Sequence, residues 1–307
     1  LGGAVRGHGF VVDKVNQMQD YLVDLINKFY IVTQHSDPSV TLSTAATAQV
    51  AAPLAVQRVR HPLKARQAQV LARHQTSPGF VRLTLGGPEM VDFVSLGFDD
   101  HFKLILPAES ADRPVLPGLE DGRPVFEGPR PMMRDYTPQR YDATAGTLEV
   151  EFALHEAGPA SDWARQAAVG SWVGVAGPRG SMVVPPDLPW HVLMGDASAL
   201  PAIVRRLAEL PASTRAIVRV LVENPADQRP LTSAAALDVA WVDSLPAAAR
   251  SLVLPEGAGY LWAAGEHSDM AAVRDALRAL PGADPRRMRV SAYWRRGDAG
   301  HHAELAD

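Results

Sequence analysis

Three side chains with complementary chemistry stand close together in residues 134–138. This stretch reads Arg134-Asp135-Tyr136-Thr137-Pro138. In an extended strand, Arg134 and Tyr136 lie on one face. A guanidinium group binds phosphate in a forked geometry, a tyrosine ring lies against a flat heterocycle, and a threonine hydroxyl reaches a ring nitrogen or carbonyl. The stretch by itself is also compatible with a strand end that carries a surface arginine and a half-buried tyrosine.

Residues 155–164 predict a strand end, a turn of small residues and the start of a helix. They read His155-Glu156-Ala157-Gly158-Pro159-Ala160-Ser161-Asp162-Trp163-Ala164. Ser161 suits the N-cap of the helix. The N–H groups and the positive dipole end of such a turn attract an anion, and small residues let a ligand approach the backbone closely. The alternatives are an ordinary capped surface helix and a solvated His155.

The composition of the chain narrows the kinds of chemistry. With 307 residues, of which 47% are hydrophobic, the chain is long enough for two domains. A formal charge of −4 argues against nucleic acid or an anionic membrane as the main partner. Cysteine is absent, which excludes disulfides, cysteine-bound iron–sulfur clusters and thiol redox chemistry. Redox work therefore needs a bound organic cofactor or a metal with nitrogen and oxygen ligands.

Membrane spans and metal sites are not predicted. No run of about 18 apolar residues occurs, and no signal-peptide pattern is visible, so we expect a cytoplasmic protein. The neighbouring residues His301 and His302 have no third ligand in the pattern. Because adjacent side chains seldom converge on one ion, we interpret this pair as a solvated tail.

The first sixty residues differ in composition from the rest of the chain. They contain Lys14 and Lys28, two of the four lysines. Residues 11–30 have the apolar spacing of an amphipathic helix, and residues 41–52 are rich in Ser, Thr, Ala and Gln, as a linker is. We therefore expect residues 1–60 to form a poorly ordered or helical extension and linker, which is either appended to the working protein or no part of it.

Residues 61–187 predict an antiparallel sheet or a small barrel. Short alternating runs, separated by clusters of Gly, Pro and Asp, cover residues 66–73, 80–85, 102–106 and 148–154. In the last run, Leu148, Val150 and Phe152 face one way, whereas Glu149 and Glu151 face the polar side. A further strand precedes the sharp turn Gly177-Pro178-Arg179-Gly180.

Residues 188–307 predict strands that alternate with helices, which is typical of an open parallel sheet. We expect strands at residues 191–195, 216–222, 239–242, 259–264 and 288–294, and helices from Pro201 onward and over residues 269–280. Ligands of such sheets bind at the carboxyl ends of the strands. No G-x-G-x-x-G follows the first strand, so the usual dinucleotide fingerprint is missing.

Several stretches together resemble one family. In the first half these are Arg134-x-Tyr136-Thr137-Pro138, His155-x-x-Gly158-Pro159-Ala160-Ser161-x-Trp163-Ala164 and Gly177-Pro178-Arg179-Gly180. They resemble the FAD-binding half of the siderophore-interacting proteins, which are cytosolic ferric-siderophore reductases of the ferredoxin–NADP reductase superfamily. In the second half, the similar stretches are Gly195-Asp196-Ala197-Ser198-Ala199-Leu200-Pro201-Ala202-Ile203, Trp262-Ala263-Ala264-Gly265-Glu266 and Tyr293-Trp294-Arg295-Arg296-Gly297.

The resemblance covers residues 61–297 and implies a β + α/β fold. It would consist of an N-terminal antiparallel FAD-binding β-barrel followed by an open parallel-sheet domain of the NAD(P)H-binding kind. Two positions depart from the pattern of the family. Gln139 stands where many members carry a second arginine, and Ala197 and Ser198 stand where many carry Glu and Thr.

The resemblance also implies roles for single residues. Arg134, Tyr136 and Thr137 would hold the flavin ring and phosphate. The turn Gly158-Pro159-Ala160-Ser161 would hold the pyrophosphate, with His155 and Trp163 beside it. The other cofactor-binding residues would be Asp196, Ala264, Gly265 and Glu266. Lys103, Arg295 and Arg296 would bind the siderophore, and the two arginines beside two aromatic residues suit an anionic catecholate. The alternatives are a solvated strand residue for Lys103 and, for the arginines, a strand end with a cation–π contact to its own neighbour.

The functional hypothesis is a cytosolic FAD enzyme that reduces Fe(III) held by a siderophore. NADH, NADPH or reduced ferredoxin would supply the electrons, and a flavin can pass them on singly. Hard oxygen ligands hold Fe(III) far better than Fe(II), so reduction would release the metal. No residue needs to act as a general acid or base. The alternatives are a general NAD(P)H–flavin oxidoreductase with another small acceptor, and a non-catalytic module that binds a flavin or a siderophore.

Overall fold

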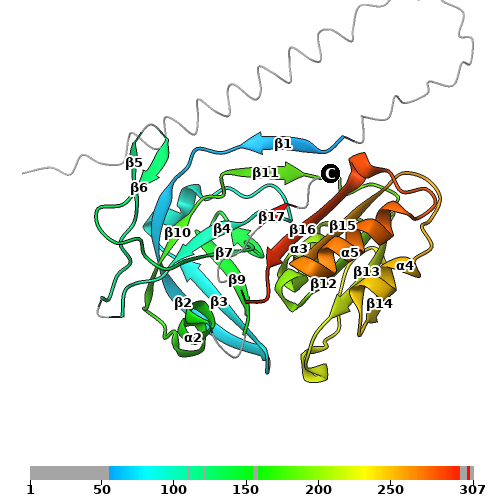
Figure 1. The fold of residues 1–307 in the computed structure, drawn as a ribbon. Helices are drawn as coiled ribbons and strands as arrows, with labels where there is room; N and C mark the ends of the chain where they lie inside the picture. Colours follow the sequence, from blue (N-terminus) through cyan, green and yellow to red (C-terminus); the bar gives the residue numbers. More distant parts are fainter. Residues whose placement is uncertain (1–54, 110, 121, 155–157, 298–302, 305–307) are drawn as a thin grey trace, which may run out of the picture. The chain divides into compact units, whose positions relative to one another are not determined.

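The computed structural model of the chain describes residues 55–109, 111–120, 122–154, 158–297 and 303–304 (Figure 1). The predicted helix at residues 11–30 and the linker at residues 41–52 lie outside the described residues. His155 and the pair His301 and His302 also lie outside them. Among the helices that the structure describes, none is both long and apolar enough to cross a membrane.

The first half of the described chain folds into a seven-stranded antiparallel sheet. Its strands are β2 (Ala65–Ser77), β3 (Phe80–Gly86), β4 (Phe102–Ile105), β7 (Met133–Tyr136), β8 (Arg140–Asp142), β9 (Thr147–Ala153) and β10 (Trp172–Ala176), in the order β7-β4-β10-β2-β3-β9-β8. Strands β7 and β8 lie at opposite edges, yet residues 137–139 alone connect them. Because three residues span only about 10 Å, the sheet must curl until its edges approach. This confirms the predicted antiparallel barrel.

Strand β9 shows why the alternating pattern forms a barrel wall. Leu148, Val150 and Phe152 are fully buried and face the core, as predicted. Glu151 lies on the opposite, polar face, as predicted, but its side chain is completely buried there. It accepts hydrogen bonds from Thr76 at 2.9 Å and Arg82 at 3.3 Å and also pairs with Arg229, which belongs to the second half of the chain. The second domain thus covers a face that would otherwise meet water.

The first half also contains one helix and two pairs of short strands. Helix α2 (Pro159–Gln166) packs on the barrel core through Ala160 and Ala164. Strands β5 (Gly118–Glu120) and β6 (Arg123–Val125) form a separate hairpin. Strand β1 (Gln57–Arg60) pairs antiparallel with β11 (Gly180–Val183). Since β1 lies inside the segment assigned to the extension, the folded part of the chain begins before residue 61.

The effect of an N-terminal truncation on stability should depend on whether the truncation removes strand β1. We expect that deletion of residues 1–55 leaves the melting temperature and the FAD content unchanged, whereas deletion of residues 1–60 lowers the melting temperature. The longer deletion removes the backbone hydrogen bonds to β11, each worth about 0.5–1.5 kcal/mol. For a protein of this size, about 1 kcal/mol corresponds to roughly 2–4 °C. Thermal melts of both truncations test this, and an insoluble shorter truncation or equal melts would contradict it.

The second half forms a six-stranded sheet, as the alternating pattern predicted. Its strands are β12 (Trp190–Asp196), β13 (Arg215–Leu221), β14 (Ala236–Trp241), β15 (Gly259–Glu266), β16 (Met288–Trp294) and β17 (Ala303–Glu304), in the order β14-β13-β12-β15-β16-β17. All neighbours run parallel except β17, which is antiparallel to β16. The resulting β + α/β fold confirms the predicted class.

Helices cover both faces of the parallel sheet. Helix α3 (Leu200–Glu209) packs with Leu193, Val218 and Trp262 on one face. Helices α4 (Leu245–Arg250) and α5 (His267–Arg278) pack together on the other face, around Val192 and Leu261 (Figure 1). Helix α4 was not predicted, because its six residues are too few to show a helical period.

Candidate flavin and electron-donor site

Strand β7 carries the first of the candidate side chains. Arg134 and Tyr136 stand opposite Leu104 and Phe102 of β4, two buried residues, and therefore share the core-facing side of the sheet. The Tyr136 ring lies 4.3 Å from the ring of Phe152, measured between centroids. Burial raises the pKa of the Tyr136 phenol, so the ring is neutral at physiological pH. A neutral, half-buried ring suits contact with an aromatic ligand.

The guanidinium group of Arg134 is available for an anion. Its Nη1 donates to the backbone oxygen of Met133 at 2.8 Å, and within the described residues it forms no ion pair. Arg134 thus presents a half-buried, uncompensated positive charge beside Tyr136. This is the arrangement that a phosphate group requires.

Helix α2 lies close to the same aromatic residues through Trp163. Phe152 contacts the Trp163 ring at a centroid distance of 6.1 Å, so Tyr136, Phe152 and Trp163 form a continuous row. The row joins the two stretches that the sequence marked as cofactor-binding, residues 134–138 and 155–164. The structure therefore links Tyr136, through Phe152, to helix α2, whose first turn contains Pro159, Ala160 and Ser161.

The prediction that Ser161 caps helix α2 was wrong. The helix begins at Pro159, and Gly158 is its N-cap residue, with no side-chain cap. Ser161 lies inside the first turn and is buried, as is Ala160. Without a capping side chain, this end of the helix relies on the backbone N–H groups of its first turn, which keep the affinity of a helix N-terminus for an anion.

Asp196 connects the carboxyl ends of three parallel strands. Its Oδ1 accepts hydrogen bonds from the backbone N–H of Ser198 at 2.9 Å and the Ser198 hydroxyl at 2.6 Å. Its Oδ2 accepts from the Glu266 N–H and from Trp294 Nε1, both at 2.8 Å. Burial raises the pKa of the carboxyl against these bonds. With four donors on a buried carboxylate, Asp196 holds β12, β15 and β16 in register at the edge where ligands of parallel sheets bind.

The other candidate residues of this edge also shape the backbone. Gly265 has a φ of +156°, and a Cβ there would lie 2.6 Å from Asp196 Oδ2, so the position requires glycine. Glu266 caps helix α5, because its Oε2 accepts from the N–H groups of Ser268 at 2.6 Å and Asp269 at 3.1 Å. Although burial opposes it, the backbone hydrogen bonds lower the pKa of Glu266. Ala264 is fully buried.

The candidate siderophore-binding cations are exposed. Lys103 lies on β4 with 49% of its side chain exposed, and its Nζ pairs with Asp135 Oδ2 at 2.7 Å. Arg295 and Arg296 follow strand β16 directly, and both are exposed. Lys103 points away from the face of Arg134 and Tyr136, because successive residues of a strand alternate.

Sequence reasoning missed the residues that join the two domains. Tyr293 of β16 donates its hydroxyl to Asp99, which also accepts from Arg289 Nε at 2.6 Å. Thr137 is hydrogen bonded to the same tyrosine. Arg205 of α3 donates to the backbone oxygen of Pro138 at 2.9 Å. No local pattern signals such contacts, since each partner lies more than 60 residues away.

Comparison with known proteins agrees with both halves of this description. Residues 69–182 match the family model described as siderophore-interacting FAD-binding domain, and residues 188–297 match that of the siderophore-interacting protein. The NADPH-dependent ferric-chelate reductase of Escherichia coli K12 is 36% identical over 247 residues, which cover 78% of this chain and 96% of the relative. The ferric vibriobactin reductase ViuB of Vibrio cholerae is 28% identical over 254 residues, which cover 78% and 93%.

A solved structure shows the same fold. The siderophore utilization protein from T. fusca superposes with a TM-score of 0.74 at 32% identity, over 80% of this chain and 98% of that one. Together with the two family matches, which between them span most of the chain, this likeness extends over barrel and parallel sheet alike. The chain therefore belongs to the family of siderophore-interacting proteins, with an FAD-binding barrel followed by a siderophore-interacting α/β domain.

Proposed function

We propose that this protein is an FAD-dependent reductase of ferric siderophores that works in the cytoplasm and takes its electrons from NAD(P)H. The observation that supports the proposal is the row of Tyr136, Phe152 and Trp163, which links strand β7 to helix α2 in a barrel that matches an FAD-binding domain. Among the described residues, Arg134 of the same strand has no ion-pair partner. The names of the relatives in Escherichia coli and Vibrio cholerae, a ferric-chelate reductase and a ferric vibriobactin reductase, support the substrate class.

The described residues fit FAD. Arg134 offers a charge for the phosphate, Tyr136 a neutral ring for the isoalloxazine, and Thr137 a hydroxyl for its polar edge. The N-terminus of α2, Gly158 to Ser161, offers backbone N–H groups for the pyrophosphate, with Trp163 beside it and His155 just before it in the chain. Bound FAD would accept two electrons together and pass them to iron one at a time.

The carboxyl edge of the parallel sheet is the proposed place for the electron donor. Asp196, Ala264, Gly265 and Glu266 build this edge, and we propose that they act mainly through the backbone positions that they hold. The side-chain oxygens of Asp196 already accept four hydrogen bonds, which leaves little room for direct contact with a nicotinamide. The relative in Escherichia coli is named NADPH-dependent, so NADPH is the first donor to test, before NADH and reduced ferredoxin.

The exposed cations provide the proposed binding surface for the chelate. Lys103, Arg295 and Arg296 can attract an anionic ferric siderophore without contacting the iron. No group needs to donate or accept a proton, because electron transfer to Fe(III) alone weakens its binding to hard oxygen ligands. The chain must hold the flavin, dock the chelate close to it and limit side reactions.

Anaerobic flavin oxidation against a panel of ferric chelates tests the function. The purified protein should be yellow, and NADPH, NADH or reduced ferredoxin should bleach it. A ferric siderophore should then reoxidise the flavin faster than oxygen or a quinone does. A colourless protein would point to a binding module, and faster reoxidation by a quinone would point to a general flavin oxidoreductase.

Replacement of Lys103 or Arg295 by Ala is expected to raise the Michaelis constant for an anionic ferric catecholate. The effect should shrink at high salt, which screens exposed charges, and it should be smaller for a neutral or cationic chelate. FAD content and bleaching by NAD(P)H should stay as in the parent. Steady-state kinetics on one anionic and one cationic chelate, each at low and high salt, measure this.

Asp135 provides a control of opposite sign. Its carboxylate neutralises Lys103 at 2.7 Å, so Asp135→Asn should lower the Michaelis constant for the anionic chelate. If Lys103→Ala weakens both chelates equally, or if the flavin is lost, these residues support the fold and the chelate docks elsewhere.

A further inference from the structure

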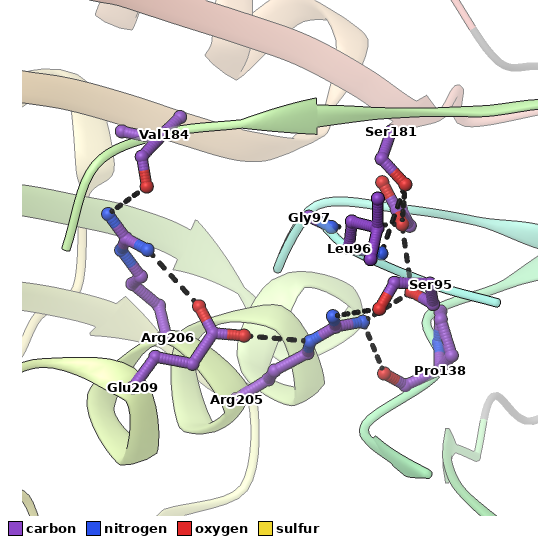
Figure 2. A network of polar contacts seen from close by, with 10 residues as sticks. Ser95, Leu96, Gly97, Pro138, Ser181, Val184, Arg205, Arg206 and Glu209 are labelled. Atoms are coloured by element: carbon purple, nitrogen blue, oxygen red, sulfur yellow. Dashed lines mark hydrogen bonds and ion pairs between the residues drawn. The ribbon is translucent and has the colours of Figure 1, made fainter. Parts of the chain in front are cut away.

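Arg205, on helix α3 of the parallel-sheet domain, binds two segments of the FAD-binding domain at once (Figure 2). Its Nη1 donates to the backbone oxygen of Pro138 at 2.9 Å and to the hydroxyl of Ser95 at 2.7 Å. Its Nη2 donates to the backbone oxygen of Ser95 at 3.1 Å, and its Nε pairs with Glu209 at 3.1 Å. Only 12% of the side chain is exposed, so the bonds are well shielded from water.

The Ser95 segment is a rigid support for this contact. Asp100 is 3% exposed, and its Oδ2 accepts hydrogen bonds from the hydroxyl of Ser95 at 2.8 Å, the N–H of Gly97 at 3.1 Å and the hydroxyl of Ser181 at 2.6 Å. A Cβ at Gly97 would lie 2.5 Å from the backbone oxygen of Met182, so this close packing requires glycine. Arg205 therefore bonds to a segment whose own position is fixed.

The Pro138 segment, in contrast, has few bonds of its own. Within the described residues, the buried side-chain amide of Gln139 has no hydrogen-bond partner, and only the Gln139 N–H bonds to the barrel, at Glu149 O, 3.0 Å away. Pro138 has no N–H. The two residues before Gln139 are bonded to the other domain: Arg205 donates to the backbone oxygen of Pro138, and Tyr293 is hydrogen bonded to Thr137.

We propose that Arg205 is a positioning residue for the flavin, although it lies outside the FAD-binding domain. The inference rests on the proposed role of Arg134, Tyr136 and Thr137 in flavin binding. Pro138 directly follows these residues. The hydrogen bond that holds its carbonyl therefore also fixes the backbone where the chain leaves β7. Removal of Arg205 leaves the buried carbonyl of Pro138 without its hydrogen-bond donor. We expect the segment to move until this carbonyl is hydrogen bonded to water. A binding site loses affinity when its groups move by as little as about 0.5–1 Å.

Arg205→Met tests the proposal, with Arg219→Met as a matched control. Arg219 is 18% exposed, and its Nη1 donates to Val218 O at 2.9 Å, Asp238 O at 3.0 Å and Asp238 Oδ1 at 3.0 Å, all within the parallel-sheet domain. Both variants should lower the melting temperature of the apoprotein. Arg205→Met alone should weaken FAD binding, by about tenfold in a fluorescence titration, and shift the visible spectrum of the bound flavin.

Two conservative variants keep the test decisive. Arg205→Lys retains one cation and should recover part of the FAD affinity. Tyr293→Phe keeps the ring that lies 6.4 Å from Trp262 but removes the hydroxyl that bonds to Thr137 and Asp99, so it should weaken FAD binding as well. If Arg205→Met does not fold, the intermediate affinity predicted for Arg205→Lys and the loss in Tyr293→Phe carry the test.

The outcomes separate this inference from the proposed flavin site. FAD binding by Arg205→Met at the parental affinity, or an equal loss in Arg219→Met, would overturn the positioning role while the flavin site stands. Parental FAD affinity in Arg134→Ala would instead overturn the flavin site itself.

Discussion

Arg134→Ala is expected to lower the affinity for FAD by about 10- to 100-fold, because a charge-assisted hydrogen bond to a phosphate is worth roughly 1.5–3 kcal/mol. Within the described residues, the Arg134 guanidinium has no ion-pair partner and lies beside Tyr136. The positive charge of Arg134 is therefore not neutralised by a described carboxylate and is available for a phosphate. Loss of this side chain removes a ligand contact and very little core, so the melting temperature of the apoprotein should hardly change.

Fluorescence titration of the apoprotein with FAD measures this affinity. Arg140→Ala is a suitable control, since Arg140 lies at the other end of the same connection, is 71% exposed and already pairs with Glu149. It should change the affinity by less than twofold. Unaltered FAD binding by Arg134→Ala would place the flavin site elsewhere.

Acid is expected to destabilise the parallel-sheet domain through His191. This residue of β12 is fully buried, with its ring 6.3 Å from that of Tyr260. Burial, together with the charge of Arg206, lowers the pKa of His191 from 6.5 to about 3. The unfolded chain takes up a proton at His191 as the pH falls below 6.5, whereas the folded protein does so only near pH 3. The free energy of unfolding should therefore fall between these values, by about 3 kcal/mol at about pH 4.5.

Melting of parent and His191→Leu at neutral pH and at about pH 4.5 tests this contribution. The variant cannot take up the proton in either state, so acid should lower its melting temperature much less. The exposed His74 provides the control, because His74→Leu removes a histidine without removing a buried one. If acid lowers all three melting temperatures equally, His191 is not the acid-sensitive group.

Local patterns were enough to predict the fold class and to nominate candidate cofactor residues. The alternation of Leu148, Val150 and Phe152 predicted a strand with one buried face, and the strands and helices after residue 188 predicted the parallel sheet. The stretch from Arg134 to Thr137 showed its chemistry through residue types alone. These signals are readable because side-chain direction repeats every two residues in a strand and about every 3.6 in a helix.

The tertiary structure alone decided which residues meet. Phe152 seemed an ordinary core residue, yet it joins Tyr136 to Trp163. Glu151 had the position of a solvated side chain, but Arg229 of the other domain covers it. Asp196 had the position of a ligand contact, but it bonds to the ends of two other strands, and Arg205 reaches Pro138 across 67 residues. Such contacts depend on how the barrel curls and where α3 docks, and because they join residues far apart in the chain, no local period encodes them.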